Sequence, residues 1–465
     1  MAIGSSAIFF SSCKGKSMDG MIIFTQVAGK GQDINSVTGD SLGYVPQARI
    51  VALDPYRTRA SLKVLTADYY TARSPEISYD AKYLLFAAQQ KQNDPWQIWE
   101  MNLEDSKIRQ VTTSTENCTY PAYLPGKRLV FSKLAINDTS KTGHSLFTCN
   151  LDGSDIKKIT FNPHAYFAST VLKDGRVLTI SRQLYPDQGD PVFIVLRPDG
   201  TKAEMFYKGI EGSALSGRGW ETMNGKIVFI ESDKSCQEGG NVISIRYNRP
   251  LHTRVNLTSE IKGDFNTVFP MQSGRLLVSY RQTEDDRYAL YEFDPENKVL
   301  GQAIYNNKDY NALDAVVVEK HERPKKLPSE VDMGVKTGLL LCQDINVVDM
   351  QSSGHCSSFP KSGRIEVIGI DSTLGVVQVE EDGSFYLKVI ADTPFKIQTI
   401  DEKGRVLHGP CEWIWLRPNE RRGCIGCHQN NELVPENRVP LSVKKPPVII
   451  PVHISNVDEK KVTLE

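Results

Sequence analysis

Two cysteines and a histidine near the C-terminal end have a spacing that could carry chemistry. They are Cys424, Cys427 and His428, in the sequence Cys-Ile-Gly-Cys-His. A c-type haem needs two thiols that add across its two vinyl groups, and an imidazole beside the second thiol that reaches the iron. The spacing therefore predicts one covalent haem c, with thioethers at Cys424 and Cys427 and with His428 on the iron.

A zinc site and a redox-active dithiol are the alternative interpretations of this motif. A structural zinc takes four ligands, so two more cysteines or histidines would be needed, and only Cys411 and His408 lie close by in the sequence. A thioredoxin-like Cys-x-x-Cys begins a helix after a strand, whereas the sequence before this motif predicts strands only. The residues favour haem.

The other face of the iron decides what such a haem could do. His453 and His408 are the first candidates for a distal ligand, followed by Met350 and Met333. A second protein ligand would give an electron-transfer centre, whereas an open face would bind a small ligand.

Three arginines near the motif could pair with the haem propionates. Arg417, Arg421 and Arg422 carry guanidinium groups, which match the geometry of carboxylates. The alternative interpretation is a solvated basic turn.

Most of the chain before the motif is a repeat. The phrases "SPEISYDAKYLLFAAQQ", "QIWEMNLED" and "IRQVT" (74–112) return in four further copies, at a spacing of about 46 to 50 residues. The copies alternate apolar and polar positions and break at Asp-Gly, Asn-Gly, Pro-Gly or Ser-Gly, which predicts short strands joined by tight turns. Four such strands per copy are typical of a β-propeller blade.

The two ends of the repeat region predict a sixth blade. Residues 21–27, 48–55 and 62–66 supply three strands, and residues 311–318 supply a fourth. A blade built from both ends closes the ring and removes open sheet edges. We therefore expect an all-β protein with a six-bladed propeller over 21–320. Its isolated histidines should be surface or packed residues: His144, His164 and His252.

A charged, proline-bearing linker (321–334) should follow the propeller, then a small β-sandwich (335–418) and a haem-bearing tail (419–465). Trp413 and Trp415 fall on one face of a predicted strand at 412–418. We expect them to pack in the sandwich core, with contact to the haem as the alternative.

Composition and the N-terminal segment bear on location. Lysine plus arginine (55) balances aspartate plus glutamate (56), so nucleic acid is not an expected partner. Residues 1–20 resemble a bacterial lipoprotein signal with Cys13 as the lipidated residue, although no basic residue precedes its apolar stretch. No other stretch is long and apolar enough to span a membrane. We expect export to the periplasm or cell surface, with a possible lipid anchor.

The remaining cysteines predict little chemistry. Cys149 and Cys236 are expected to be buried thiols, and Cys342 with Cys356 is the pair that best suits a disulfide.

The chain resembles a known family through its blades and its motif region. The blades resemble those of TolB-like proteins, and "WIWLRPNERRGCIGCH" (413–428) is similar to the region before a covalent c-type haem in relatives of the hydrazine synthase alpha subunit. The resemblance implies haem attachment at Cys424, Cys427 and His428. It also implies that hydrazine synthesis uses a second haem tethered through another Cys-His pair. This chain holds one Cys-His dipeptide, so hydrazine synthesis is not expected of it.

These observations predict an exported monohaem c-type cytochrome that exchanges electrons with a redox partner protein docked on the propeller or near the haem edge. A haem enzyme with an open iron face is one alternative. A propeller binding module with a structural haem is the other. The oligomeric state does not follow from the sequence.

Overall fold

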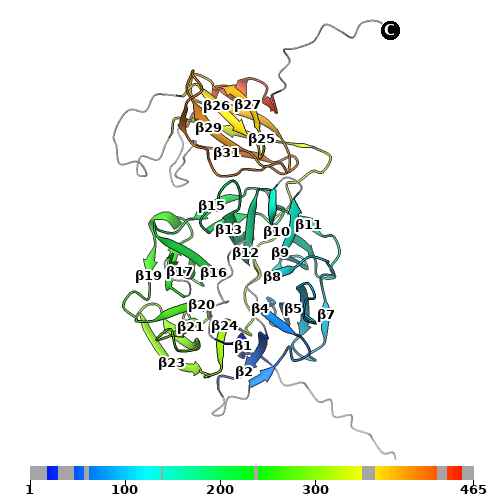
Figure 1. Cartoon of the computed structure of the whole chain (residues 1–465), viewed down its shortest axis with the longest axis vertical. Coiled ribbons are helices and arrows are strands. Elements are labelled where there is room, and N and C mark those ends of the chain that lie inside the picture. The colour runs from blue at the N-terminus through cyan, green and yellow to red at the C-terminus, as the bar shows by residue number, and fades with distance from the viewer. Residues whose placement is uncertain are drawn as a thin grey trace, which may run out of the picture.

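The computed structural model describes residues 18–29, 47–56, 62–137, 140–234, 239–347, 362–426 and 437–452. Within these ranges the regular structure is β, apart from the short 3-10 helices η1 (Pro250–His252) and η2 (Leu441–Lys444). The strands form eight four-stranded sheets. Six sheets make a ring, and the other two make a smaller unit beside it (Figure 1).

Five blades of the ring take their strands in chain order, from the innermost strand outward, which confirms the predicted repeat. Their strands are β4 (Thr71–Ile77), β5 (Tyr83–Gln89), β6 (Gln97–Asn102) and β7 (Ile108–Gln110); β8 (Cys118–Leu124), β9 (Arg128–Asn137), β10 (Ser140–Asn150) and β11 (Lys157–Lys158); β12 (His164–Val171), β13 (Val177–Gln183), β14 (Val192–Leu196) and β15 (Glu204–Tyr207); β16 (Ser213–Glu221), β17 (Lys226–Asp233), β18 (Asn241–Arg246) and β19 (Val255–Asn256); β20 (Asp264–Pro270), β21 (Leu276–Arg281), β22 (Ala289–Asp294) and β23 (Val299–Tyr305). We did not predict β23.

The sixth blade joins the two ends of the propeller, as predicted. Its innermost strand β24 (Tyr310–Val317) pairs antiparallel with β1 (Ile22–Ala28), which continues to β2 (Arg49–Leu53) and β3 (Leu62–Val64). The ladder between the first and last strands closes the ring without a free inner edge.

Irregular inner strands line the axis of the ring. The ladder between each innermost strand and its neighbour shifts register, as between Arg73 and Glu76 on β4. Ser74, Tyr120 and Asp314 have φ values of 57°, 51° and 49°, in the left-handed region that non-glycine residues seldom adopt. These bulges bend the strands where six blades converge.

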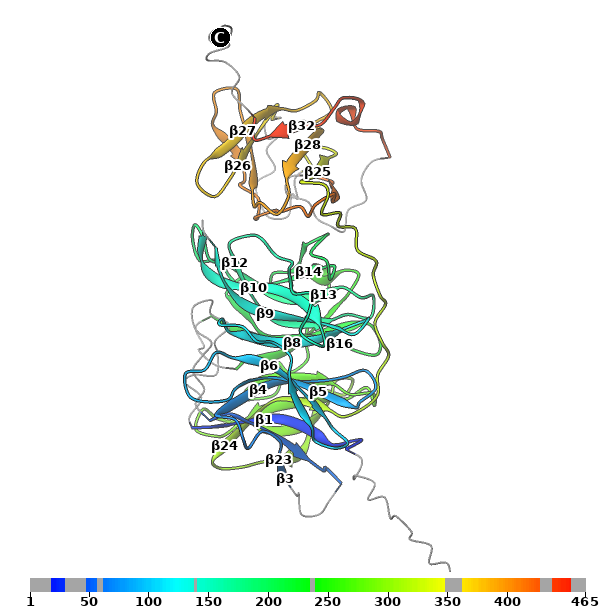
Figure 2. The ribbon, with the colours of Figure 1, turned by 90° about the vertical axis from the view of Figure 1, so that its right-hand side faces the viewer.

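The segment between the two units runs across one face of the ring (Figures 1 and 2). The His321 N–H donates to Tyr79 O (3.1 Å) and the Lys325 N–H to Lys173 O (3.0 Å), at turns of two different blades. The predicted linker is therefore bound to the propeller along its length.

The smaller unit is a sandwich of two sheets, as predicted. One sheet has the order β31-β25-β28-β32 and the other has the order β27-β26-β29-β30. The strands are β25 (Thr337–Cys342), β26 (Arg364–Ile368), β27 (Thr373–Gln378), β28 (Phe385–Ile390), β29 (Lys396–Ile400), β30 (Val406–His408), β31 (Arg421–Cys424) and β32 (Val448–Ile450). Leu340, Ile365, Leu387 and Ile397 are among the buried side chains between the sheets.

Two strands correct the boundary that we drew between sandwich and tail. Strands β31 and β32 lie within the predicted tail (419–465), yet they form the two edges of one sandwich sheet. Both pair in parallel, β31 with β25 and β32 with β28. Parallel pairing joins strands far apart in the chain, and for this reason local turn signals could not reveal it.

Candidate functional site

The first cysteine of the motif sits on a fixed edge strand. In the β25–β31 pair, Cys424 lies opposite Cys342. The pairing continues beyond the strand, because the Gln343 N–H donates to Cys424 O (3.0 Å) and the Asp344 N–H to Ile425 O (3.3 Å). Cys427 and His428 lie outside the described residues. The described half of the motif is therefore held by the main chain of the sandwich.

Gly426 lies tightly against the sandwich. A Cβ atom there would lie 2.3 Å from Val347 O and 2.9 Å from Val347 Cβ. At Gly423, three residues earlier and within β31, a Cβ atom would meet nothing within 4 Å. The glycine at 426 thus lets the chain pass against the Asp344–Val347 turn on its way to Cys427.

The Cys424 sulfur is in a partly apolar setting. Cys424 is half-buried and packs on the sandwich core, as does Cys411. Burial raises the pKa of the Cys424 thiol, and the Arg422 charge opposes that rise. The side chain therefore remains a thiol at neutral pH, the form whose S–H adds across a vinyl group. A partly buried thiol at the end of an edge strand suits covalent haem attachment.

Two of the three arginines predicted to meet the propionates, Arg422 and Arg417, have other partners. Arg422 donates through Nη2 to Glu420 Oε1 (2.7 Å) and through Nε to the same oxygen (3.0 Å). Arg421 is exposed, and strand alternation directs its side chain away from the face of Arg422 and Cys424.

Arg417 corrects our prediction most clearly. Its guanidinium donates to Asp392 Oδ1 (2.6 Å) and to the main-chain oxygen of Asp199 in the propeller (3.0 Å), and it lies 4.6 Å from the centroid of the Phe161 ring. With 6% of its surface exposed, Arg417 joins the two units rather than facing the motif.

Glu420 connects the propeller to the motif strand and was missed in the sequence. Its carboxylate is 1% exposed and accepts the Lys202 N–H of the propeller (2.8 Å), the Arg417 N–H (2.8 Å) and the Arg422 guanidinium. Because it immediately precedes β31, Glu420 fixes the start of the strand that ends in Cys424. A charged residue in a charged turn gave no sequence signal of such burial.

The two tryptophans also belong to the contact between the units, which corrects their predicted place in the sandwich core. Trp415 packs with Val130, Tyr166 and other buried residues of the two blades that begin with β8 and β12. The Trp413 indole N–H donates to Tyr185 O (2.9 Å). Residues 412–418 form an isolated bridge, Phe395 to Ile414, instead of the predicted strand. The sandwich therefore docks on the rim of the ring.

His408 ends β30 on the edge of the other sandwich sheet. The edges formed by β27 and β32 meet, with the Val452 N–H donating to Leu374 O (2.9 Å), and β30 and β31 are the edge strands on the opposite side of their two sheets. His408 and Cys424 thus belong to the same side of the sandwich. Of the other distal candidates, Met333 is exposed, and His453 and Met350 lie outside the described residues.

Other predicted residues have mixed outcomes. Cys149 is a buried free thiol, whereas Cys13, Cys236 and Cys356 lie outside the described residues. In the described part of the chain, no group of three or more Cys, His, Asp or Glu could hold a metal ion. The same part contains no helix with the length and apolar character of a membrane span.

Known proteins match the chain over both units. The model of the hydrazine synthase alpha subunit middle domain matches residues 342–429. Hydrazine synthase subunit alpha of Kuenenia stuttgartiensis is 23% identical over 512 positions, covering 83% of this chain and 63% of that protein. The chain therefore spans less than two thirds of that relative's length.

Solved structures match the fold. Kuenenia stuttgartiensis hydrazine synthase aligns with a TM-score of 0.79 and 20% identity, covering 92% of this chain and 72% of that chain. TolB from Acinetobacter baumannii aligns with a TM-score of 0.46 and 13% identity, covering 65% of this chain and 67% of that one. The matched family model, the matched relative and the hydrazine synthase structure together show that this chain is similar to the hydrazine synthase alpha subunit and shares its propeller-containing fold.

Proposed function

We propose that this chain carries one covalent haem c on Cys424, Cys427 and His428, and that it exchanges electrons with a redox partner protein. The observation that carries the proposal is the placement of Cys424, a partly buried thiol at the end of a fixed edge strand, three residues before Cys427. The adjoining His428 completes the spacing that haem attachment requires.

The bound haem would supply one-electron transfer, and the chain's own residues would hold and orient it. Cys424 and Cys427 would anchor the group, and His428 would bind the iron. Glu420 and Gly426 fix the strand and the turn on either side of Cys424. A rigid mount of this kind keeps a fixed distance between the haem and a docked partner.

The propeller is the proposed docking platform. Its ring is closed and holds the sandwich on its rim through Trp415, Arg417 and Glu420. We further propose export, with a lipid anchor at Cys13, on the basis of the N-terminal segment described above. Hydrazine synthesis is not part of the proposal, because the chain has one Cys-His dipeptide.

Expression with a cytochrome c maturation system tests haem attachment. The purified chain should retain haem after denaturation and show one haem per chain in a pyridine haemochrome spectrum. Cys424→Ala with Cys427→Ala should abolish this haem, whereas Cys149→Ala, which changes a buried propeller thiol, should leave it in place. Zinc in place of haem in the purified chain would refute the proposal.

A carbon monoxide binding test distinguishes an electron-transfer haem from a haem enzyme with an open iron face. A reduced spectrum that carbon monoxide does not change indicates two protein ligands, as expected for electron transfer. A shifted spectrum would indicate an open face and support the enzyme alternative. Replacing His408 by Ala in the first case tests whether His408 is the second ligand.

A further inference from the structure

Arg73 carries a buried guanidinium edge without a partner among the described residues. The side chain is 8% exposed, and its Nε and Nη2 atoms have no hydrogen-bond partner there. These two nitrogens lie on the same edge of the guanidinium and form the fork that holds a carboxylate side-on. Two aromatic rings fix the group, because its carbon lies 4.8 Å from the Trp96 centroid and 5.4 Å from the Tyr120 centroid.

A second buried arginine in the same propeller shows what such a fork normally holds. Arg281 is 7% exposed and lies 4.7 Å from the centroid of the Tyr288 ring. Its Nε and Nη2 atoms both lie 3.3 Å from Asp264 Oδ2. Burial and aromatic contact are thus alike at the two arginines, but Arg281 has a carboxylate on its fork. Leaving charged donors unpaired in a buried place is unfavourable, so a ligand at Arg73 would stabilise the folded chain.

Other buried polar groups in this part of the propeller also lack described partners. His144 is 4% exposed with neither ring nitrogen bonded, and burial together with the Arg73 charge lowers its pKa to about 4. It is therefore neutral at pH 7 and can donate one N–H. Thr119 Oγ1 and Ser74 Oγ, on the adjacent strands β8 and β4, are buried and also lack partners.

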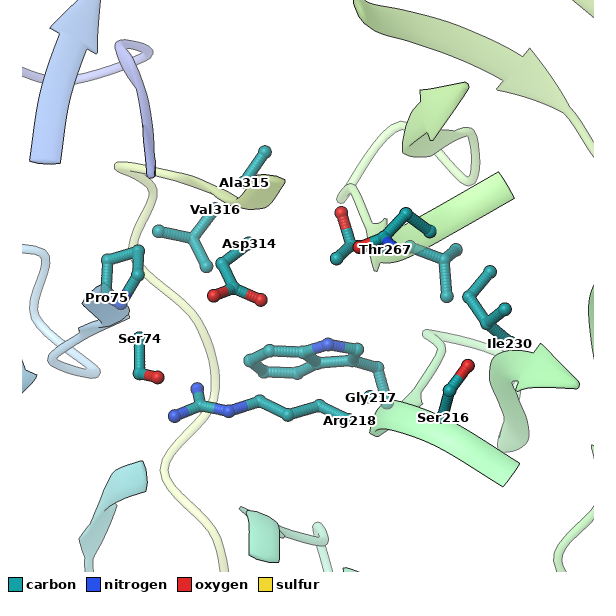
Figure 3. Close-up of a pocket in the computed structure, with 13 residues that line it drawn as sticks. Ser74, Pro75, Ser216, Gly217, Arg218, Ile230, Thr267, Asp314, Ala315 and Val316 are labelled. Carbon is teal, nitrogen blue, oxygen red and sulfur yellow. The ribbon is translucent and has the colours of Figure 1, made fainter. Parts of the chain in front are cut away.

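The neighbouring part of the axis holds a second arginine, which is paired with a carboxylate. Arg218 on β16 reaches across the ring to Glu76 on β4, with Nη1 2.6 Å from Oε2. Arg218 and Arg73 both act on the buried carboxyl of Asp314, whose pKa burial nevertheless raises. Figure 3 shows Arg218 and Asp314 pointing toward Ser74, beside a cavity of about 20 Å³. That volume suits one water-sized group, and the cavity is lined by Ser74 and Asp314 but not by Arg73 itself.

From these contacts we propose that the propeller binds a small planar oxyanion of the carboxylate type, held side-on by Nε and Nη2 of Arg73 between the inner strands β4 and β8. The Trp96 and Tyr120 rings hold the fork in place, and neutral His144 offers a further donor. A planar anion with two oxygens matches the fork, whereas a spherical chloride ion meets only one point of it.

Formate titration of the full-length protein tests this site. Binding of isotope-labelled formate is followed by nuclear magnetic resonance, at constant ionic strength maintained with chloride. We expect saturable binding by the wild type. Arg73→Lys, which keeps the charge but removes the fork, should weaken it at least 10-fold. Arg281→Lys is the matched control and should change the affinity by less than 2-fold, because that fork already holds Asp264.

Three results would overturn the proposal: no saturable binding by the wild type, equal affinity of wild type and Arg73→Lys, or equal competition by chloride and formate. A crystal structure of the wild type grown in formate decides the matter if Arg73→Lys does not fold. Density for a planar anion against Nε and Nη2 supports the site, whereas a water molecule or a protein group in that position contradicts it.

Discussion

Replacement of His164 by Asn should make the folded chain less sensitive to acid. His164 is 6% exposed, and its Nδ1 atom lies 2.8 Å from the Ser181 hydroxyl. Burial, assisted by the nearby Lys396 charge, lowers the pKa of His164 to about 3. The folded protein therefore keeps this imidazole neutral at pH values where the unfolded chain protonates it.

The size of the expected loss in folding stability follows from the proton that the unfolded chain gains at His164 on acidification. The imidazole has a pKa of about 6.5 in an unfolded chain, so its contribution to stability is present above that pH and is lost as the pH falls toward 3. Between pH 7.5 and pH 5 the loss is about 2 kcal/mol. His144, whose pKa is also lowered, acts in the same direction, and Glu76, whose pKa burial raises to about 7, acts in the opposite one. Comparing the variant with the wild type therefore gives the part of this pH-dependent stability loss that comes from His164 alone.

Urea unfolding at pH 7.5 and pH 5 measures this share. We expect His164→Asn to be less stable than the wild type at pH 7.5 but to lose about 2 kcal/mol less on acidification. Tyr166→Phe is the control, because it removes a neighbouring buried hydrogen bond to Asn162 (2.6 Å) and leaves the imidazole. It should cost about 1 kcal/mol at both pH values. Equal acid losses in His164→Asn and wild type would refute the reasoning.

Three further substitutions, two of them with matched controls, test the contacts that hold the motif in place. Gly426→Ala should reduce covalent haem yield, because its Cβ would meet Val347 O, whereas Gly423→Ala should not; equal yields from both variants would contradict this. Glu420→Ala should destabilise the chain by about 3–5 kcal/mol in urea, since it leaves buried donors unpaired. Glu380→Ala, which breaks a more exposed pair with Lys445, should cost about 1 kcal/mol or less. Trp415→Ala should cost about 3–5 kcal/mol, and calorimetry should then show the sandwich and propeller melting separately; a single unshifted transition would speak against the docking role.

The repeat and its turns predicted the propeller well because each blade is built from local pairings. Alternating residues and Asp-Gly-type turns specify hairpins within about 20 residues, and hairpins alone generate most of each blade. Even the closing blade could be predicted, because the sequence showed a lone strand at β24 and three strands, β1 to β3, without an inner partner. The fourth strand of the fifth blade, β23, was missed because its exposed residues "VLGQAIY" show no clean alternation.

The contacts around the motif could not be predicted because they join segments distant in the chain. Trp415 has the alternation of a core residue in a sandwich strand, and nothing in its own segment shows that its core belongs to the propeller. Glu420 is buried only because Lys202, over two hundred residues earlier, brings a main-chain N–H to it. Cys424 was singled out by its spacing, but its strand partner β25 is parallel and remote, so its place in the sandwich was not predicted.

One turn of the propeller contacts both the linker that leads to the sandwich and the segment that leads into the motif strand β31. The turn between β14 and β15 carries Asp199, whose carboxylate accepts the Glu330 N–H of the linker (2.8 Å) and whose main-chain oxygen accepts Arg417 (3.0 Å). Lys202, at the end of this turn, holds Glu420 at the start of β31. The linker and the motif strand are thus fixed to the same point on the rim. A partner that recognises this part of the rim would meet the proposed haem at a set distance, and loosening Glu420 should slow electron exchange before it lowers haem content.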